Sequence, residues 1–218
     1  MKITWFGHAA FLLEASDGTR LIVDPYRSGS FDGKLAYKPI DTEADAVLAT
    51  HRHEDHAAVD TIPGDPRILV EPRSADIGAV RVRGIPVYHD TDAGEARGEN
   101  TILVIEDAGL RVVHLGDLGH ELDSETIEEI GEVDVLLIPV GGLFTIDAAT
   151  AAKIAADLDP RVVIPMHYRT SRCAFDISPV DDFLELHAEV RELGEHTVEL
   201  SKDTLPEERT VLVLDYAR

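Results

Sequence analysis

A six-residue segment of the chain contains four side chains that could bind metal ions: His51, His53, Asp55 and His56. Side chains two residues apart in an extended chain project to the same side, so His51 and His53 can present two imidazoles to one ion. Asp55 and His56 follow where the chain is expected to turn into a short helix, and their side chains can diverge toward a second ion. The segment therefore predicts a metal centre with room for two ions.

Short strands are expected to position this segment. An apolar run at residues 45–49 leads directly into it, and turn residues separate further apolar or alternating runs. The expected strands cover residues 2–6, 9–15, 19–24, 45–49, 67–70, 80–88, 101–106, 110–115, 133–140 and 161–165.

Three helices are expected beside these strands, at residues 124–130, 147–158 and 179–193. The last has the clearest signals, with Ser178 as N-cap, Pro179 at the first helical position and Gly194 beyond the end. Strands in both halves of the chain, with helices inserted after them, favour two packed sheets covered outside by helices. We expect residues 1–218 to form a single domain.

The chain is strongly acidic, with 42 Asp and Glu against 20 Lys and Arg and a formal charge of -22. A field of that sign repels phosphate backbones, and no basic run compensates, so nucleic acid is not expected as a partner. Such a composition would also suit a protein that stays soluble in concentrated salt.

Neither a membrane partner nor a disulfide is expected. No run approaches the roughly 20 apolar residues of a membrane span. Cys173 is the only cysteine and cannot form an internal disulfide, which favours a reducing compartment, the cytoplasm. The expected partner is a small, anionic substrate molecule, and a homo-oligomer is left open.

The sequence resembles the metallo-β-lactamase superfamily, whose signature His-x-His-x-Asp-His is matched in full by the histidine-rich segment. The further matching blocks are Trp5-Phe6-Gly7-His8-Ala9, Val23-Asp24-Pro25, Leu115-Gly116-Asp117, Pro139-Val140-Gly141-Gly142 through Thr145, and Pro165-Met166-His167-Tyr168. Together they look like the branch of ascorbate-6-phosphate lactonase-like and N-acyl-phosphatidylethanolamine phospholipase D-like hydrolases. The resemblance implies an α/β fold, a four-layer αββα sandwich with a dinuclear site at one edge.

The resemblance also implies a complete ligand set. It assigns the first metal to His51, His53, His89 and Asp117. It assigns the second metal to Asp55, His56, His167 and the same Asp117, which would bridge both ions. The three added residues each follow an expected strand, a place where sites are commonly built. The implied cofactors are two divalent metal ions, with zinc as the first choice and manganese or iron as alternatives.

The implied activity is hydrolysis of a small ester-like substrate, a lactone or a phosphodiester, by a hydroxide that bridges the metals. Asp55 is expected to orient that hydroxide. For His8 two roles stay open, a purely structural one, or one in which it supports the site or contacts the substrate and could supply a proton. Tyr168, Arg169 and Arg172 are candidate contacts for an anionic substrate group, and solvated loop arginines are the alternative for the last two.

Two other functions stay open, an iron oxidoreductase with the same ligand types and a non-catalytic metal-binding or regulatory protein on the same fold. Asp24 is expected either to accept a hydrogen bond from a ligand imidazole or to be a turn aspartate. His114 is expected to be a packed core residue.

Overall fold

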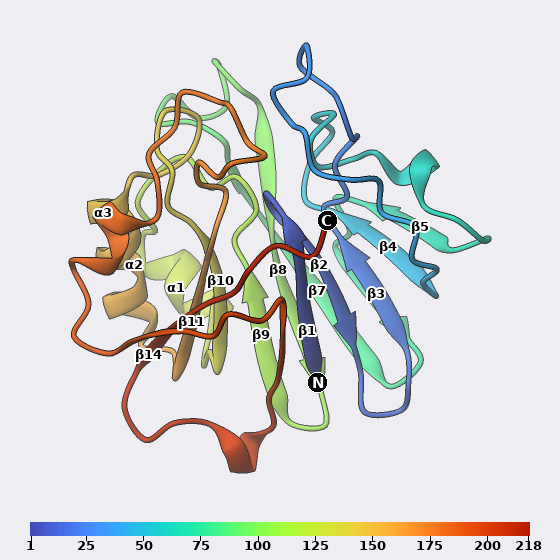
Figure 1. Ribbon diagram of the computed structural model, residues 1–218. Coiled ribbons are helices and arrows are strands. Elements are labelled where there is room, and N and C mark those ends of the chain that lie inside the picture. Colours follow the sequence, from blue (N-terminus) through green and yellow to red (C-terminus); the bar gives the residue numbers. More distant parts are fainter.

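The computed structural model describes residues 1–218 and contains two β-sheets that pack face to face (Figure 1). The six-stranded sheet has the order β13-β1-β2-β3-β4-β5, and the eight-stranded sheet the order β12-β14-β11-β10-β9-β8-β7-β6. The predicted mixed α/β fold with two sheets is confirmed.

The six-stranded sheet begins as an antiparallel meander and continues with parallel strands. Its strands are β1 (Lys2–Gly7), β2 (Ala10–Glu14), β3 (Arg20–Val23), β4 (Ala46–Ala49), β5 (Arg67–Val70) and β13 (Thr197–Glu199). Alternate residues of these strands enter different cores, as β3 illustrates. Leu21 and Val23 join the large core cluster, whereas Ile22 joins a smaller cluster with Tyr26, Tyr37 and other residues.

The eight-stranded sheet has an antiparallel half and a parallel half. Its strands are β6 (Ser74–Ile77), β7 (Val80–Tyr88), β8 (Glu99–Asp107), β9 (Leu110–His114), β10 (Val135–Pro139), β11 (Val162–Met166), β12 (Val190–Glu192) and β14 (Thr210–Val213). Every residue of the parallel strands β10 and β11 is buried, as expected for parallel strands covered on both faces.

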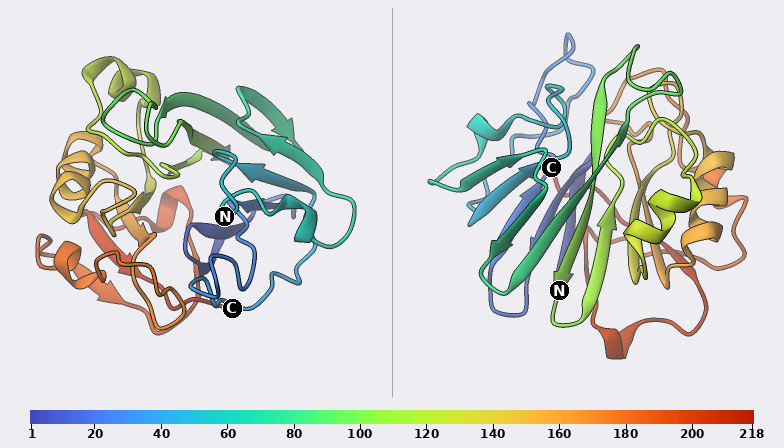
Figure 2. Two further views of the ribbon diagram at one scale, coloured as in Figure 1. Left: turned by 90° about the horizontal axis from the view of Figure 1, so that it is seen from above. Right: turned by 180° about the vertical axis from the view of Figure 1, so that it is seen from behind.

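The α-helices lie along the eight-stranded sheet (Figures 1 and 2). They are α1 (Ser124–Ile130), α2 (Ala148–Leu158) and α3 (Asp181–Leu184), and two 3-10 turns occur at Val59–Thr61 and Lys202–Thr204. The Asp123 and Asp147 carboxylates accept backbone N–H groups at the starts of α1 and α2, which satisfies donors that a helix leaves free. The second outer layer, over the six-stranded sheet, consists largely of loops rather than α-helix. None of the helices combines the length and apolar character needed to cross a bilayer.

The prediction of a helix at residues 179–193 is wrong. Only Asp181–Leu184 is α-helical, and Val190–Glu192 forms strand β12 beside β14. A helix at residues 179–193 would present Val180, Phe183, Leu184, His187 and Val190 on one apolar face. Only Phe183 of this face is fully buried, so a longer helix would gain less from packing. Four strands, β6, β12, β13 and β14, were not predicted, because short segments carry little periodicity.

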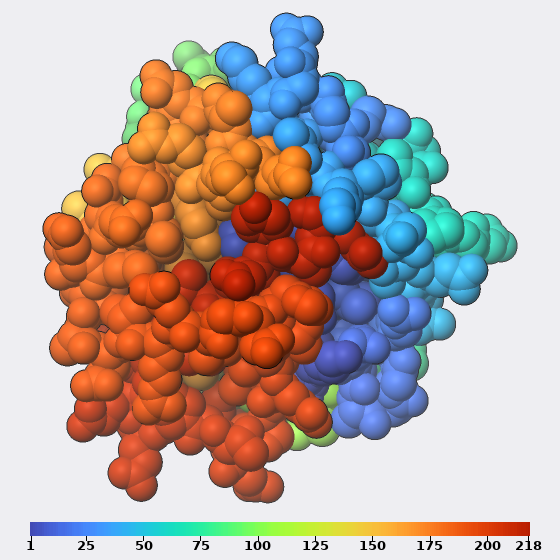
Figure 3. Space-filling view, viewed as in Figure 1, coloured from blue at the N-terminus to red at the C-terminus, as the bar shows by residue number.

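The C-terminal segment closes the seam between the two sheets, where it separates the N-terminal and later parts of the chain in the space-filling view (Figure 3). Ala217 N donates to Trp5 O at 2.9 Å, and the Tyr216 ring lies 5.3 Å from that of Tyr37. This contact fixes the β1 strand, which leads into His8.

Candidate metal centre

The predicted ligands follow the ends of β4, β7, β9 and β11 and meet at one edge of the sandwich. His8, which follows β1, and His167, which follows β11, both adopt left-handed backbone conformations, with φ of 52° for each. Non-glycine residues in this conformation carry a cost and concentrate at functional sites. The two turns are joined directly, because His167 N donates to His8 O at 3.1 Å.

Asp117 is positioned by the tight turn after β9. Gly116 has φ of 55°, and a Cβ there would lie 2.3 Å from Asn100 Oδ1, so only glycine fits. The Asn100 side chain is fully buried and spans the turn: its Nδ2 donates to Leu115 O at 2.8 Å, and its Oδ1 accepts from Asp117 N at 3.2 Å. The turn thus holds the Asp117 carboxylate in a set orientation.

Imidazoles surround that carboxylate. Asp117 Oδ1 lies 3.1 Å from His56 Nε2, and Oδ2 lies 3.1 Å from His89 Nε2 and 3.3 Å from His167 Nε2. His51 Nε2 is 3.9 Å from the same Oδ2. Ligand-type atoms that lie within 4.8 Å of one another form three groups: His51, His53 and His89; His51, His56 and Asp117; and His8, Asp55, His56 and His167.

Hydrogen bonds to the Nδ1 atoms orient two of the imidazoles, those of His51 and His56. The buried Asp24 carboxylate accepts from His56 Nδ1 at 2.9 Å and from the Thr50 hydroxyl at 2.8 Å. Since the Thr50 hydroxyl donates to Asp24, its oxygen is left to accept from His51 Nδ1, at 2.9 Å. Both histidines therefore turn the Nε2 atom toward Asp117, the orientation that a metal ligand needs.

These residues fit divalent cations. His56 Nε2 and Asp117 Oδ1 are buried and make no hydrogen bond, although buried polar atoms almost always have a partner. Burial, together with the nearby His56, lowers the pKa of His51 to about 3, so His51 is neutral as a ligand must be. Burial opposes a charge on His56, but Asp117, Asp24 and Asp55 raise its pKa. A cation between Asp117 and His56 would take the place of that proton.

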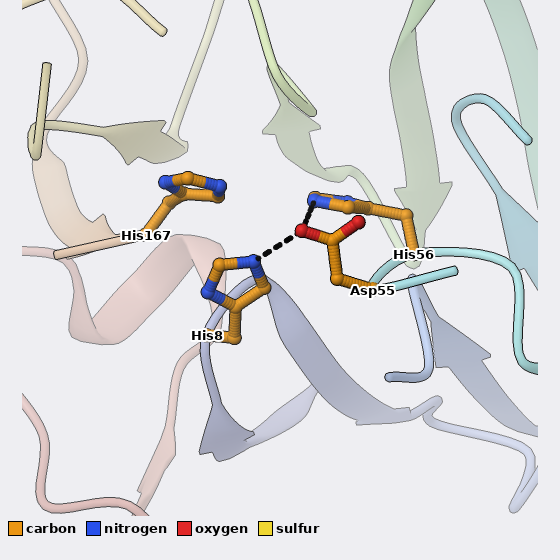
Figure 4. Close-up of side chains that lie close together, drawn as sticks. All are labelled: His8, Asp55, His56 and His167. Carbon is orange, nitrogen blue, oxygen red and sulfur yellow. Dashed lines mark hydrogen bonds and ion pairs between the residues drawn. The ribbon is translucent and has the colours of Figure 1, made fainter. Parts of the chain in front are cut away.

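His8 lies beside Asp55, with its ring directed at the Asp55 carboxylate (Figure 4). Its Nε2 donates to Asp55 Oδ2 at 3.2 Å, and its ring centroid is 4.0 Å from that of His167. Burial and the neighbouring His167 lower the pKa of His8 to about 4. His8 has no exposed surface, so it supports the Asp55 carboxylate from inside the protein.

A cavity of about 580 Å³ opens over this cluster. Five side chains of the cluster line it, namely His53, Asp55, His89, Asp117 and His167. The remaining lining residues are Phe31, Asp32, Lys34, Glu54, Ala96, Arg97, Phe144 and Phe175. The cavity therefore combines a candidate metal centre with aromatic and cationic side chains.

Comparisons with known proteins decide the family. The model of the beta-lactamase superfamily domain matches residues 2–167. A UPF0173 metal-dependent hydrolase of Archaeoglobus fulgidus is 35% identical, with 78% of this chain and 84% of the relative covered. Another from Methanopyrus kandleri is 34% identical, with 89% and 93% covered. The chain belongs to the UPF0173 family of the metallo-β-lactamase superfamily.

A solved structure agrees with this membership. A Thermotoga maritima protein of the metallo-β-lactamase superfamily superposes with a TM-score of 0.80 at 39% identity. The match covers 98% of this chain and 97% of the other.

The three residues predicted to contact the substrate do not line the cavity of this protein. They are Tyr168, Arg169 and Arg172. Tyr168 is buried against Trp5, with ring centroids 5.2 Å apart. The chain then turns away, as Arg169 N donates to Ser178 O at 2.9 Å, and Arg172 is exposed outside the lining. The cations of the lining are Lys34 and Arg97 instead.

Sequence reasoning also missed Thr50 and Asn100, which orient His51 and the Asp117 turn. Thr50 directly precedes the histidine-rich segment, which marks it as a candidate for supporting a ligand. Asn100 precedes the expected strand at residues 101–106, beside Glu99 and Thr101, and carries no comparable signal. His114 is a packed core histidine as expected, with Nε2 donating to Ala9 O and Nδ1 accepting from Gly116 N, each at 3.0 Å.

The loop that carries Arg97 is built on one carboxylate. The Asp90 oxygens accept the backbone N–H groups of Asp92, Gly94, Ala96 and Arg97 at 2.7 to 3.0 Å. Desolvation opposes the charge on Asp90, but these hydrogen bonds lower its pKa to about 2. The bonds are therefore complete at neutral pH and weaken only as the pH falls from about 4 toward 2.

Asp90→Ala is expected to release this loop, because four backbone donors lose their acceptor at once. Hydrogen exchange of the amides of residues 90–98 should accelerate relative to the wild type. Asp90→Asn keeps one carbonyl acceptor, so its exchange rates should fall between those of the wild type and Asp90→Ala. Asp92→Ala is the matched control and should exchange like the wild type. Unchanged exchange in Asp90→Ala would show that the carboxylate does not hold the loop.

Proposed function

We propose that the protein is a dinuclear metal-dependent hydrolase of small, anionic, ester-like substrates, either lactones or phosphodiesters. The observation that carries the proposal is the buried Asp117 carboxylate among four imidazoles at the base of an open cavity. The relatives' description as metal-dependent hydrolases supports it.

In this proposal the ligand set divides into two groups that share Asp117. His51, His53 and His89 hold one ion, and Asp55, His56 and His167 hold the other. Zinc is our first choice, because it suits imidazole and carboxylate ligands, with manganese and iron as alternatives. When bound, two such ions lower the pKa of water to near neutrality and polarise an oxygen of the scissile bond.

The chain's own residues then have distinct roles. Asp55 lines the cavity, so its carboxylate can hold the proton of the attacking water, while His8 fixes the carboxylate from behind. Because His8 has no surface in the cavity, we assign the proton of the leaving group to solvent rather than to His8. Lys34 and Arg97 can attract and hold an anionic group against the negative field of the protein.

The substrate class follows from the sequence resemblance to lactonase-like and phospholipase D-like hydrolases. The experiment is to purify the protein, measure its bound metal and assay bis-p-nitrophenyl phosphate and a simple lactone. We expect metal-dependent turnover of at least one substrate. Occupied sites without either activity would instead favour a metal-binding or regulatory protein.

His8 is expected to matter for one metal more than for the other. His8→Asn tolerates the left-handed backbone but removes the imidazole that orients Asp55. Loss of such a supporting contact typically weakens metal affinity by about 10- to 100-fold. Zinc titration should therefore show one weakened and one unchanged site, whereas the exposed control His196→Asn should match the wild type. Two unchanged sites in His8→Asn would refute this role.

A further inference from the structure

Three phenylalanines from separate loops form an aromatic wall in the cavity: Phe31, Phe144 and Phe175. The Phe31 and Phe175 ring centroids are 5.2 Å apart, and those of Phe144 and Phe175 are 5.8 Å apart. Both pairs meet nearly at right angles, the arrangement in which aromatic rings attract each other. The three rings thus form one continuous apolar surface.

This aromatic wall begins beside the candidate metal centre. The Phe175 ring lies 5.8 Å from the His8 ring, and His8 holds Asp55. The wall then extends outward to Phe144, over which the Arg97 guanidinium lies at 5.7 Å. An apolar group attached directly to the scissile centre could therefore reach the wall.

The wall and its flank keep apolar side chains exposed at a cost. Phe31 is 41% exposed, and Leu143, next to Phe144, is 58% exposed. Both residues also have left-handed backbones, with φ of 52° and 61°. Bulky residues in this conformation are uncommon and mark sites where surrounding structure imposes the strain. Phe31 lines the cavity, so an apolar ligand bound there would cover its exposed side chain.

Hydrogen bonds hold the backbone on both sides of Phe144. Arg97 Nη2 donates to Leu143 O at 3.1 Å, and Gly142 N donates to Ile146 O at 3.2 Å. Phe31 belongs to a turn in which Lys34 N donates to Phe31 O at 3.1 Å. Two separately braced turns therefore present phenylalanines to the same cavity.

We infer that the substrate carries an aromatic or similarly flat apolar group, next to the bond that is cleaved, and that this group packs against Phe31, Phe144 and Phe175. The inference rests on the proposed function for the position of the cleaved bond. It narrows the substrates to aryl-bearing esters, lactones or phosphodiesters and disfavours small polar ones such as unsubstituted sugar lactones.

The test compares two non-hydrolysable ligands with the same head group, phenylphosphonate and methylphosphonate, by calorimetric titration of the zinc-loaded protein. The wild type should bind phenylphosphonate roughly tenfold more tightly or better, as expected for burial of one phenyl group. In the double variant Phe31→Ala/Phe144→Ala this preference should largely disappear, because the affinity for phenylphosphonate should fall to about that for methylphosphonate. Neither side chain is fully buried, so the fold should survive, which the zinc content and melting temperature check.

Equal affinities in the wild type, or a preference that persists in the double variant, would overturn the inference. The two proposals fail separately. A clear preference for phenylphosphonate in a protein that hydrolyses neither assay substrate refutes the proposed hydrolase activity and supports the aromatic site. Hydrolysis without any preference for the phenyl group refutes the aromatic site alone.

Discussion

Asp117→Ala is expected to lose bound metal and nearly all hydrolytic turnover. The carboxylate is almost completely buried and lies within 3.1 to 3.3 Å of the Nε2 atoms of His56, His89 and His167. It is the residue that the two proposed metal sites share. Burial opposes its charge, but His167 and His56 hold its pKa well below the usual range, so it is ionised at neutral pH. Metal content by mass spectrometry and initial rates measure the loss.

A matched control comes from the mouth of the same cavity. Asp32 lines the cavity but is exposed and belongs to none of the three ligand groups. Asp32→Ala should keep its metal, and its turnover should stay within an order of magnitude of the wild type. Full activity of Asp117→Ala with empty metal sites would refute the proposed role of Asp117.

Asp24→Ala is expected to lower both stability and metal affinity. The fully buried Asp24 carboxylate accepts three hydrogen bonds, from Thr50 N at 2.7 Å, the Thr50 hydroxyl at 2.8 Å and His56 Nδ1 at 2.9 Å. Removing one partner of a buried charged pair typically lowers the free energy of unfolding by about 3–5 kcal/mol. Loss of the support behind a ligand imidazole typically weakens metal binding by about 10- to 100-fold. Urea unfolding and zinc titration measure the two effects.

The pH dependence of this contribution has a definite sign. Burial raises the pKa of Asp24, but His56, His114 and His51 together outweigh burial, and the net pKa is below its ordinary value of 3.8. The stabilisation is therefore present above about pH 4 and is lost as the pH falls below it. Asparagine tolerates the left-handed backbone at position 24, but the amide N–H of Asp24→Asn would face one of the groups that donate to Asp24. The stability and zinc affinity of Asp24→Asn should therefore fall between those of the wild type and Asp24→Ala. Wild-type stability and zinc affinity in Asp24→Ala would contradict this account.

Much of the candidate site was accessible from the sequence because its parts are local or lie at strand ends. His51, His53, Asp55 and His56 fall within six residues, so their proximity follows from chain geometry alone. Bringing Asp117 to them requires the pairing of distant strands, and the family resemblance supplied that information. The structure brings these residues together, while their roles as ligands stay predictions.

The substrate side of the cavity was not accessible in the same way. Phe31, Phe144 and Phe175 come from three loops, and nothing in their spacing signals a shared wall. Tyr168 seemed a substrate contact because it follows His167, but its ring is buried against Trp5. The prediction of a helix at residues 179–193 also failed because of contacts between distant parts of the chain. Val190 pairs with Val211 of β14 at the edge of the sheet, and this pairing overrides the local helical signals.

The central claim is a dinuclear centre bridged by Asp117. The most direct test is a crystal structure of the zinc-loaded protein with an anomalous difference map recorded at the zinc absorption edge. We expect two peaks about 3.5 to 4 Å apart, one on each side of the Asp117 carboxylate. No peak at Asp117, or a single peak that contacts neither His51 nor His56, would contradict the account.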